Sequence, residues 1–306
     1  MRTTRETPDA ARTIHFIGDP HVRVTNAARK NQFIVDCQGG LCPDPVYRVI
    51  LGDLSNENGS NVNDPVDDAT AVAWADSISA TVPWATLIGN HDIYNNNRTA
   101  AAAATSFGMP SLNQNIDVGF ARLLLVNPTT LAAYPSLPAA IKLSQATLDW
   151  LEGELAAATK PCLVCCHAPL KDTVIDSAED GSTVFDSSLE EFHVTREGDT
   201  TDTYIRDLLG EYDQAKAWVS GHCHVDARRT GSTLFTTTTC GSRQVASIHA
   251  PVVYYVTPTV DVGDPLWSVW VTVRADGKIE CRLRNHALGS WDMPADQGRV
   301  VVLTPT

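Results

Sequence analysis

Short apolar runs that end abruptly in polar residues recur along the first two thirds of the 306-residue chain. Each run is rich in Val, Ile, Leu or Cys, and its length suits a strand buried on both faces of a layered α/β protein. We expect each to form a strand followed by a polar loop. The five segments are TIHFIGDPH (13–21), YRVILGDLS (47–55), WATLIGNHD (84–92), CLVCCHAP (162–169) and AKAWVSGHCH (215–224).

Three stretches between these runs have the spacing of amphipathic helices, namely residues 67–79, 143–159 and 202–212. In the second of them, Ser144 is placed as an N-cap, and three leucines recur at helical intervals behind it. The alternation of strand, polar tip and helix predicts an α/β fold.

The last part of the chain is β-rich, with predicted strands in residues 232–240, 266–285 and 299–304 and a hairpin turn at ADGK. We interpret these strands as belonging to one domain over residues 1–306, with core motifs in 14–226 and a β-rich C-terminal part in 232–306. A separate β-domain is the alternative. Three long loops are expected at 23–45, 127–142 and 170–201, and the last of them is a candidate lid.

The polar tips are the candidate functional residues, because ligands in open α/β sheets gather beyond the carboxyl ends of the strands. In SGHCHVD, the two histidines are two residues apart and would face the same way in an extended chain. The complete set is Asp19, His21, Asp53, Asn90, His91, His167, His222 and His224.

These tips carry only oxygen and nitrogen donors, which suit Mn, Fe, Zn or Co better than a thiolate structural zinc site. One ion takes about four to six ligands, so eight candidates indicate two ions that share a carboxylate. Each residue also has a plain alternative. Asp19 and Asp53 would suit turns after glycine, and His167 would suit a core histidine.

The blocks GDPH, GDL, GNHD, CHAP and GHCH, in that order, resemble those of the calcineurin-like metallophosphoesterases. The resemblance implies a four-layer α/β/β/α sandwich with two mixed β-sheets and a dinuclear metal centre between them. It implies two divalent or mixed-valence ions, of which the first is held by Asp19, His21 and His224 and the second by Asn90, His167 and His222. Asp53 would bridge the two ions, and His91 would be the catalytic histidine.

The resemblance is greatest to small bacterial class III cyclic-nucleotide and glycerophosphodiester phosphodiesterases. It implies hydrolysis of a small phosphodiester through a metal-bound hydroxide, with a phosphomonoesterase or nucleotidase as the alternative and a non-catalytic scaffold as a further one. The second block reads GDLSNEN and lacks the arginine of the GDxVDRG block of protein phosphatases. Asn127 stands where those small phosphodiesterases often have aspartate.

The formal net charge of −13, from 36 acidic and 23 basic residues, disfavours nucleic acid as a partner. No apolar run approaches the roughly 20 residues of a membrane-spanning helix, and the N-terminus lacks the apolar segment of a signal peptide. We therefore expect a cytoplasmic protein with a small-molecule phosphoester as its partner and no membrane association.

The remaining cysteines and histidines have structural interpretations. Cys162 and Cys165 lie three apart in a predicted strand, face opposite sides and are expected to be core thiols. Cys37 and Cys42 are either reduced thiols, which we favour, or a loop disulfide. His15 is expected to be structural, whereas His193 and His249 are candidates for lining the pocket. Asp92 either orients His91 or caps the following turn.

Overall fold

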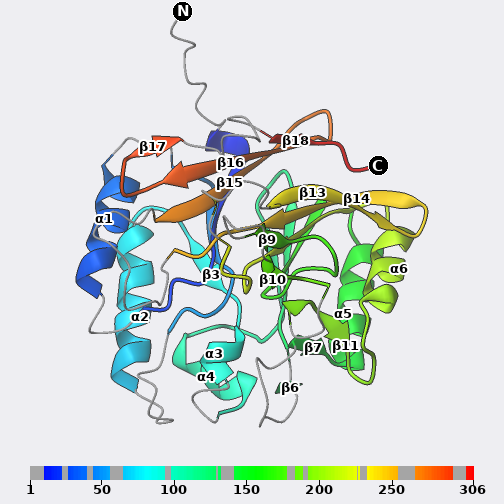
Figure 1. Ribbon diagram of the computed structural model, residues 1–306, viewed down its shortest axis with the longest axis horizontal. Coiled ribbons are helices and arrows are strands. Elements are labelled where there is room, and N and C mark those ends of the chain that lie inside the picture. The colour runs from blue at the N-terminus through cyan, green and yellow to red at the C-terminus, as the bar shows by residue number, and fades with distance from the viewer. Residues whose placement is uncertain are drawn as a thin grey trace, which may run out of the picture.

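The computed structural model describes residues 10–22, 27–39, 44–55, 65–93, 98–128, 130–131, 141–177, 183–188, 192–225, 227, 233–253, 266–291 and 301–306. Two large mixed sheets form its centre (Figure 1). Every structural statement that follows refers to these residues.

The first sheet has the strand order β17-β16-β15-β1-β2-β3, and β18 pairs with β16. Strands β1, β2 and β3 run parallel, and β15 is antiparallel to β1. The strands are β1 (Thr13–Ile17), β2 (Tyr47–Ile50), β3 (Trp84–Thr86), β15 (Trp267–Val273), β16 (Ile279–Asn285), β17 (Ser290–Trp291) and β18 (Val301–Leu303).

The second sheet has the order β13-β14-β12-β8-β5-β4. Its four inner strands are parallel, and the two outer strands are antiparallel to their neighbours. The strands are β4 (Gln114–Asp117), β5 (Arg122–Val126), β8 (Cys162–Cys166), β12 (Ala215–Ser220), β13 (Phe235–Cys240) and β14 (Arg243–His249).

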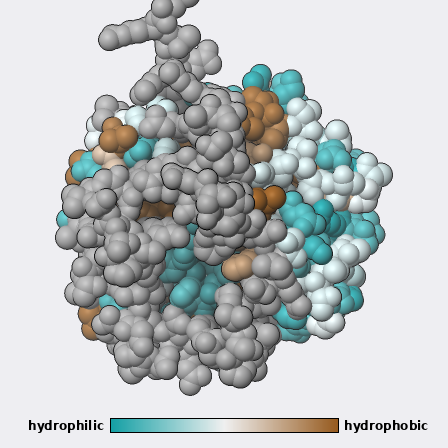
Figure 2. Space-filling model, viewed as in Figure 1, coloured by the Kyte–Doolittle hydropathy of each residue, from teal (hydrophilic) through white to brown (hydrophobic). Residues whose placement is uncertain are grey.

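Helices cover the outer face of each sheet. Helices α1 (Ala27–Gln38) and α2 (Pro65–Ile78) lie beside the first sheet, and α5 (Gln145–Ala156) and α6 (Thr203–Glu211) lie beside the second (Figure 1). The side of the molecule that carries α5 and α6 is mainly hydrophilic in the space-filling view (Figure 2). The architecture is therefore a four-layer α/β/β/α sandwich, as predicted.

The apolar core has three parts, one between each pair of layers. Phe16 faces the core between the sheets, whereas its neighbour Ile17 faces the core under α1 and α2. In β8, Cys165 faces the core between the sheets, and Cys162 faces the core under α5 and α6. The two thiols thus point to opposite faces, as a period of two requires, and both are buried and unbridged.

The three predicted helices are present. Ser144 caps α5, because its hydroxyl accepts a hydrogen bond of 3.2 Å from the backbone amide of Thr147. The leucines of α5 are buried in the same core as the side chains of β8, which explains their helical spacing. The ADGK turn joins β15 to β16, and Gly277 there has φ +81°, a conformation that favours glycine.

The prediction of a loop over residues 23–45 is wrong, since α1 occupies Ala27–Gln38. Few of the α1 side chains whose burial is described are both large and apolar and face the sheet. Phe33 and Cys37, one turn apart, are buried there, whereas Val35 is exposed. Such a narrow stripe resembles an irregular polar segment in sequence. Cys42 lies outside the described residues, so the question of its disulfide is outside them too.

The two other predicted loops contain short strands, and parts of both lie outside the described residues. The minor elements are 3-10 helix η1 (Ala10–Arg12), α3 (Asn90–Ile93), α4 (Ala100–Ser106), β6 (Thr130–Leu131), β7 (Ile141–Leu143), β9 (Ile175–Ser177), β10 (Thr183–Asp186) and β11 (Thr195–Arg196). Among the helices of the described part, none is both long and apolar enough to span a bilayer.

Candidate metal centre

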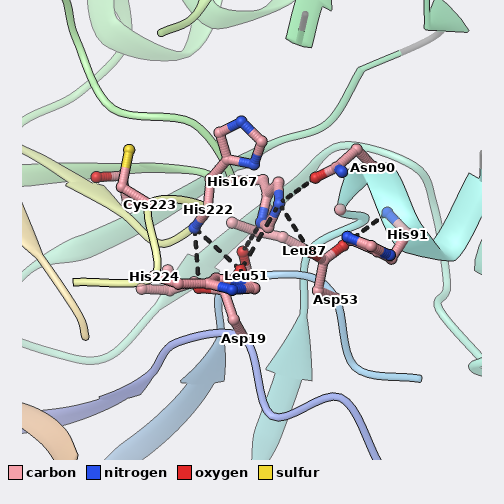
Figure 3. A network of polar contacts seen from close by, with 12 residues as sticks. Asp19, Leu51, Asp53, Leu87, Asn90, His91, His167, His222, Cys223 and His224 are labelled. Carbon is pink, nitrogen blue, oxygen red and sulfur yellow. Dashed lines mark hydrogen bonds and ion pairs between the residues drawn. The ribbon is translucent and has the colours of Figure 1, made fainter. Parts of the chain in front are cut away.

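The polar tips of five strands meet between the two sheets (Figure 3). Three tips follow β1, β2 and β3 of the first sheet, and two follow β8 and β12 of the second. The structure brings together all eight of the residues selected from the sequence.

Four of these side chains form one tight group. Asp19, His21, Asp53 and His224 each offer a ligand atom, and these atoms all lie within 4.8 Å of one another. Asp19, His21 and Asp53 are buried, and His224 has a side chain that is 20% exposed. The group therefore has one partly open side.

A second group surrounds His167. Nε2 of His167 lies 2.9 Å from Oδ1 of Asn90 and 3.4 Å from Oδ2 of Asp53. The ring of His222 lies beside it, with 4.9 Å between the ring centroids. Asp53 is therefore shared, because the same Oδ2 atom also lies 3.8 Å from Nε2 of His21 in the first group.

The hydrogen bonds of His167 test whether a cation suits this place. Nδ1 of His167 lies 2.6 Å from the carbonyl oxygen of Leu51, so Nδ1 carries a proton and donates it. In the neutral ring, Nε2 is then a bare acceptor, yet the oxygens of Asn90 and Asp53 around it also accept. A proton or a cation at Nε2 reconciles these acceptors, and a carbonyl-anchored Nδ1 is the usual arrangement of a metal-binding histidine.

Asp53 gives a second test. Its Oδ1 accepts a 2.8 Å hydrogen bond from the backbone amide of His91, whereas Oδ2 accepts no hydrogen bond of normal geometry from the described residues. A buried carboxylate oxygen without a donor is costly unless it binds a cation. The donor set fits the mixed oxygen and nitrogen coordination of Mn, Fe, Zn or Co.

The pKa values of three buried groups show how charge is distributed in the cluster. Burial raises the pKa of Asp19 to about 8, although the neighbouring His167 lowers it. Burial also raises the pKa of Asp53, but the positive charges of His167, His91 and His21 outweigh burial and hold that pKa well below its usual range. Burial lowers the pKa of His167, and the carboxylates outweigh this effect and raise the pKa to about 9. The opposite shifts of these two carboxyl groups mark the cluster as a candidate functional site.

The backbone at the ligand positions is strained. Among the described residues other than glycine, five have positive φ, and four of these five are candidate ligands. Their φ values are +41° for Asp19, +44° for His21, +49° for Asp53 and +74° for His222. Such conformations cost about 1–3 kcal/mol each and concentrate at functional sites.

Glycines next to the ligands leave space for the carboxylates. A Cβ atom on Gly221 would lie 2.6 Å from Oδ2 of Asp19, and one on Gly89 would overlap Oδ1 of Asp53. Both contacts are too close for any other residue. The glycine that precedes the polar tip is thus a steric requirement in the GNHD and GHCH blocks.

His222 and His224 reach the cluster in a way that differs from the expected one. Strand β12 ends at Ser220, so the chain at SGHCHVD is a tight loop and not an extended strand. The amide of His222 donates to both oxygens of Asp19, at 3.0 and 2.8 Å. The side chain of Cys223 points away from the cluster (Figure 3), and its thiol contacts the carbonyl of Phe192.

His91 lies at the edge of the cluster and is half-buried. Its ring packs edge-on against His21, with 5.0 Å between centroids. The next residue, Asp92, accepts hydrogen bonds from the amides of Gly89 (2.8 Å) and Ser55 (3.2 Å). Neither donor lies in the turn that follows Asp92, and the two bonds instead join the loops that carry Asp53 and Asn90.

A support network behind these two loops was not anticipated from the sequence. Arg98 donates to the carboxylate of Asp68 and, through Nε, to the carbonyl of Asp92. Asp68 in turn accepts a 2.8 Å bond from the hydroxyl of Ser55. No sequence signal marks Arg98, which follows a run of asparagines. Asn127 plays a similar part, because its Oδ1 accepts a 2.6 Å bond from the amide of Ile88.

The other histidines lie outside the cluster. His15 is buried and stacked on Trp270 at 4.5 Å between centroids, in keeping with the structural role expected for it. His249 is buried behind the GHCH loop and hydrogen-bonded to it, so it is not a pocket-lining residue of the kind expected. His193 is buried next to Phe192, whose ring lies 6.2 Å from that of His222.

Comparison with protein families agrees with this geometry. A family model described as calcineurin-like phosphoesterase matches residues 12–226, which include all five tips. The chain belongs to the calcineurin-like phosphoesterase family. The strands β13–β18 lie beyond the segment that the family model matches, although they belong to the same two sheets.

Individual relatives of the chain are distant. Protein 244L of Invertebrate iridescent virus 6, which is named as a phosphoesterase, is 25% identical over 125 residues, covering 41% of this chain and 44% of the viral protein. The purple acid phosphatase PPD1 from seeds of yellow lupin (Lupinus luteus) has a TM-score of 0.56 at 15% identity, over 92% of this chain and 52% of the lupin chain.

The protein TT1561 of Thermus thermophilus matches 92% of this chain and 97% of its own, at 11% identity and a TM-score of 0.43. The chain spans about half the length of the viral and lupin proteins that it matches. At 15% identity the lupin structure supports the fold alone.

Proposed function

We propose that the chain is a metal-dependent phosphoester hydrolase that holds two cations between its sheets. Asp53 carries this proposal, because one of its oxygens is fixed by His91 and the other lies bare between Nε2 of His21 and Nε2 of His167. A carboxylate in this position suits a bridge between two cations. One cation would be held by Asp19, His21 and His224, and the other by Asn90, His167 and His222.

Bound cations would neutralise the phosphate charge and acidify a water molecule near neutral pH. The chain itself supplies orientation and a proton. His91 is half-buried at the edge of the cluster, and its backbone is fixed on Asp53. We assign to its imidazole the stabilisation of charge on the phosphate oxygens or the protonation of the leaving alkoxide.

The substrate class that we propose is a small phosphodiester. The net charge of −13 disfavours extended polyanions such as nucleic acids. In the second block, Leu54 is fully buried and Ser55 is bonded to Asp68, so these residues bring no cation to the rim of the site. A second block without arginine suits the single negative charge of a diester better than the double charge of a monoester.

The test compares hydrolysis of bis(p-nitrophenyl) phosphate with that of p-nitrophenyl phosphate in the presence of Mn²⁺. We expect the diester to be turned over faster, and EDTA to abolish both activities. Faster turnover of the monoester would replace the diesterase proposal with a phosphomonoesterase or nucleotidase. A protein that binds Mn²⁺ and hydrolyses neither substrate would be a scaffold with the same fold.

A further inference from the structure

We propose that His249 is a positioning residue that holds the ligand loop, residues 221–224, from behind; the inference rests on the proposed metal centre. His249 is the last residue of β14, and Ser220 is the last residue of β12. These strands are parallel neighbours, and the two residues are paired in register across them. The imidazole is therefore placed by the sheet at the point where the loop begins.

Both ring nitrogens of His249 are engaged. Nε2 lies 2.6 Å from the carbonyl oxygen of Cys223, and Nδ1 lies 3.2 Å from the hydroxyl of Ser220. A carbonyl oxygen only accepts, so Nε2 carries the proton and donates it. Nδ1 then accepts from the Ser220 hydroxyl. With both nitrogens used, His249 is not available as a metal ligand, although it is only 1% exposed and close to the cluster.

The carbonyl that His249 binds lies between the two proposed ligands of the loop. Cys223 separates His222 from His224, and its side chain points away from the cluster (Figure 3). A donor on the Cys223 carbonyl fixes the peptide plane that joins Cys223 to His224. The directions of both imidazoles depend on the backbone at this point.

The loop has a conformation that needs such support. Its backbone makes two successive three-residue turns. In the first turn the amide of Cys223 donates to the carbonyl of Gly221 at 2.9 Å, and in the second the amide of Val225 donates to the carbonyl of Cys223 at 2.6 Å. His222, within the first turn, has φ +74°. Strained backbone persists only where its surroundings hold it, and the imidazole of His249 bonds to the centre of these turns.

Substitution of His249 by glutamine or asparagine distinguishes the hydrogen bond that positions the loop from the packing contribution of the imidazole ring. In His249→Gln the side-chain amide reaches approximately the place of Nε2, so it keeps a donor for the Cys223 carbonyl. In His249→Asn the amide is shorter and reaches only toward Ser220. Both variants are polar and lose the ring, so loss of packing affects both.

The measurement is Mn²⁺ affinity by titration calorimetry on the full chain, together with bound metal per chain and the circular dichroism spectrum. We expect His249→Asn to lose about 10- to 100-fold in affinity, the usual effect of removing a group that orients a ligand. On the same scale, we expect His249→Gln to stay within about threefold of the unchanged protein.

His286→Asn is the matched control. His286 is equally buried but lies directly after β16 in the first sheet, where it is bonded to Asp36 and Ser268. Its substitution should leave Mn²⁺ affinity unchanged.

Two results would overturn the inference and leave the proposed metal centre unaffected. One is an equal loss of Mn²⁺ affinity in His249→Gln and His249→Asn, and the other is unchanged Mn²⁺ affinity in folded His249→Asn. Failure of the unchanged protein to bind Mn²⁺ would instead refute the proposed function. A second measurement needs no variant. Nitrogen-15 spectra of labelled histidine should show His249 with its proton on Nε2, both without metal and with Zn²⁺, and a metal-shifted or Nδ1-protonated ring contradicts the assignment.

Discussion

Nε2 of His21 lies 3.0 Å from Nε2 of His224, although the two residues are 203 positions apart in the sequence. His21 follows β1 in the first sheet, and His224 follows β12 in the second. Two nitrogens about 2.1 Å from one ion and at right angles to each other would also be about 3.0 Å apart. The pair therefore connects the two sheets at a separation that suits a common cation.

Because this contact joins the two sheets, metal binding is expected to stabilise the whole protein. At a free Mn²⁺ concentration of about 100 times the dissociation constant, the free energy of unfolding should rise by about 2.7 kcal/mol. The measurement is urea unfolding with Mn²⁺ and with EDTA. His21→Ala should reduce the difference, whereas His91→Ala, at a residue that is not a proposed ligand, should keep it. The prediction is wrong if His21→Ala retains the full stabilisation.

Substitution of His91 is expected to separate catalysis from metal binding. His91→Ala should lower kcat by about 100- to 10,000-fold, the usual contribution of a general acid or base. Bound metal per chain should stay unchanged, because His91 bonds to Asp53 through its backbone amide, which alanine keeps. Kinetics with bis(p-nitrophenyl) phosphate and elemental analysis together give the answer. Metal loss in this variant would make His91 a ligand instead.

A methyl group on Gly89 should damage the centre. The added Cβ would overlap Oδ1 of Asp53, whose position is fixed by the amide of His91. Gly89→Ala is therefore expected to lose at least about tenfold in Mn²⁺ affinity, in the range for disturbed ligand orientation. Calorimetric titration of the folded variant measures this loss.

Gly153→Ala is the control for that substitution. Gly153 lies exposed in α5, and a Cβ there would meet nothing within 4 Å. Alanine is the better helix former by about 1 kcal/mol, so thermal stability should rise slightly while Mn²⁺ affinity stays constant. Equal Mn²⁺ affinities in the two variants would contradict the steric argument for Gly89.

Stability is expected to fall as the pH is lowered from about 7 toward 4, in part because of His286. Burial lowers the pKa of His286 to about 4, although the hydrogen bond to Asp36 opposes this effect. The unfolded chain, with a pKa near about 6.5, takes up the proton first. The stabilising contribution is therefore complete above about pH 6.5 and is lost as the pH falls, at up to about 1.4 kcal/mol per pH unit.

The measurement is urea unfolding of the metal-free protein at about pH 7, 6 and 5, the range in which this loss is expected. His286→Asn removes this titration and should show a shallower loss of unfolding free energy with falling pH than the unchanged protein. Since the ligand histidines are present in both proteins, their titration cancels in the comparison. Parallel curves for the two proteins would show that His286 contributes nothing to the pH dependence.

The positions of the ligands could be predicted because apolar runs and polar tips are local features of the sequence. Asp19, Asp53 and His167 each follow a buried strand, and strand ends in an α/β fold share one edge. The strained φ of these aspartates and the space beside Gly89 could not be predicted, because both depend on segments distant in the sequence. Similarly, the hydrogen bonds of Asp92 could not be predicted, because its donors are set by the packing of two loops.

Helix α1 and His249 show where pattern recognition fails. Phe33 and Cys37 form too narrow an apolar stripe for the helix to be distinguished from a polar loop. His249 occurs in SIHAP without a motif, and its contact with Cys223 depends on the pairing of β14 with β12. Long-range pairing of this kind leaves no periodicity in the local sequence.

The position of β1 in its sheet has a consequence for biosynthesis. Strand β1 lies between β2 and β15, and β15 begins at Trp267. The ribosome makes β1, which ends at Ile17, long before β15. One edge of β1 therefore has no partner strand until Trp267 and the residues after it have been made. The loop with Asp19 and His21 thus acquires its final frame only after β15 has been made, so the nascent chain is expected to load metal after that strand has left the ribosome and not before.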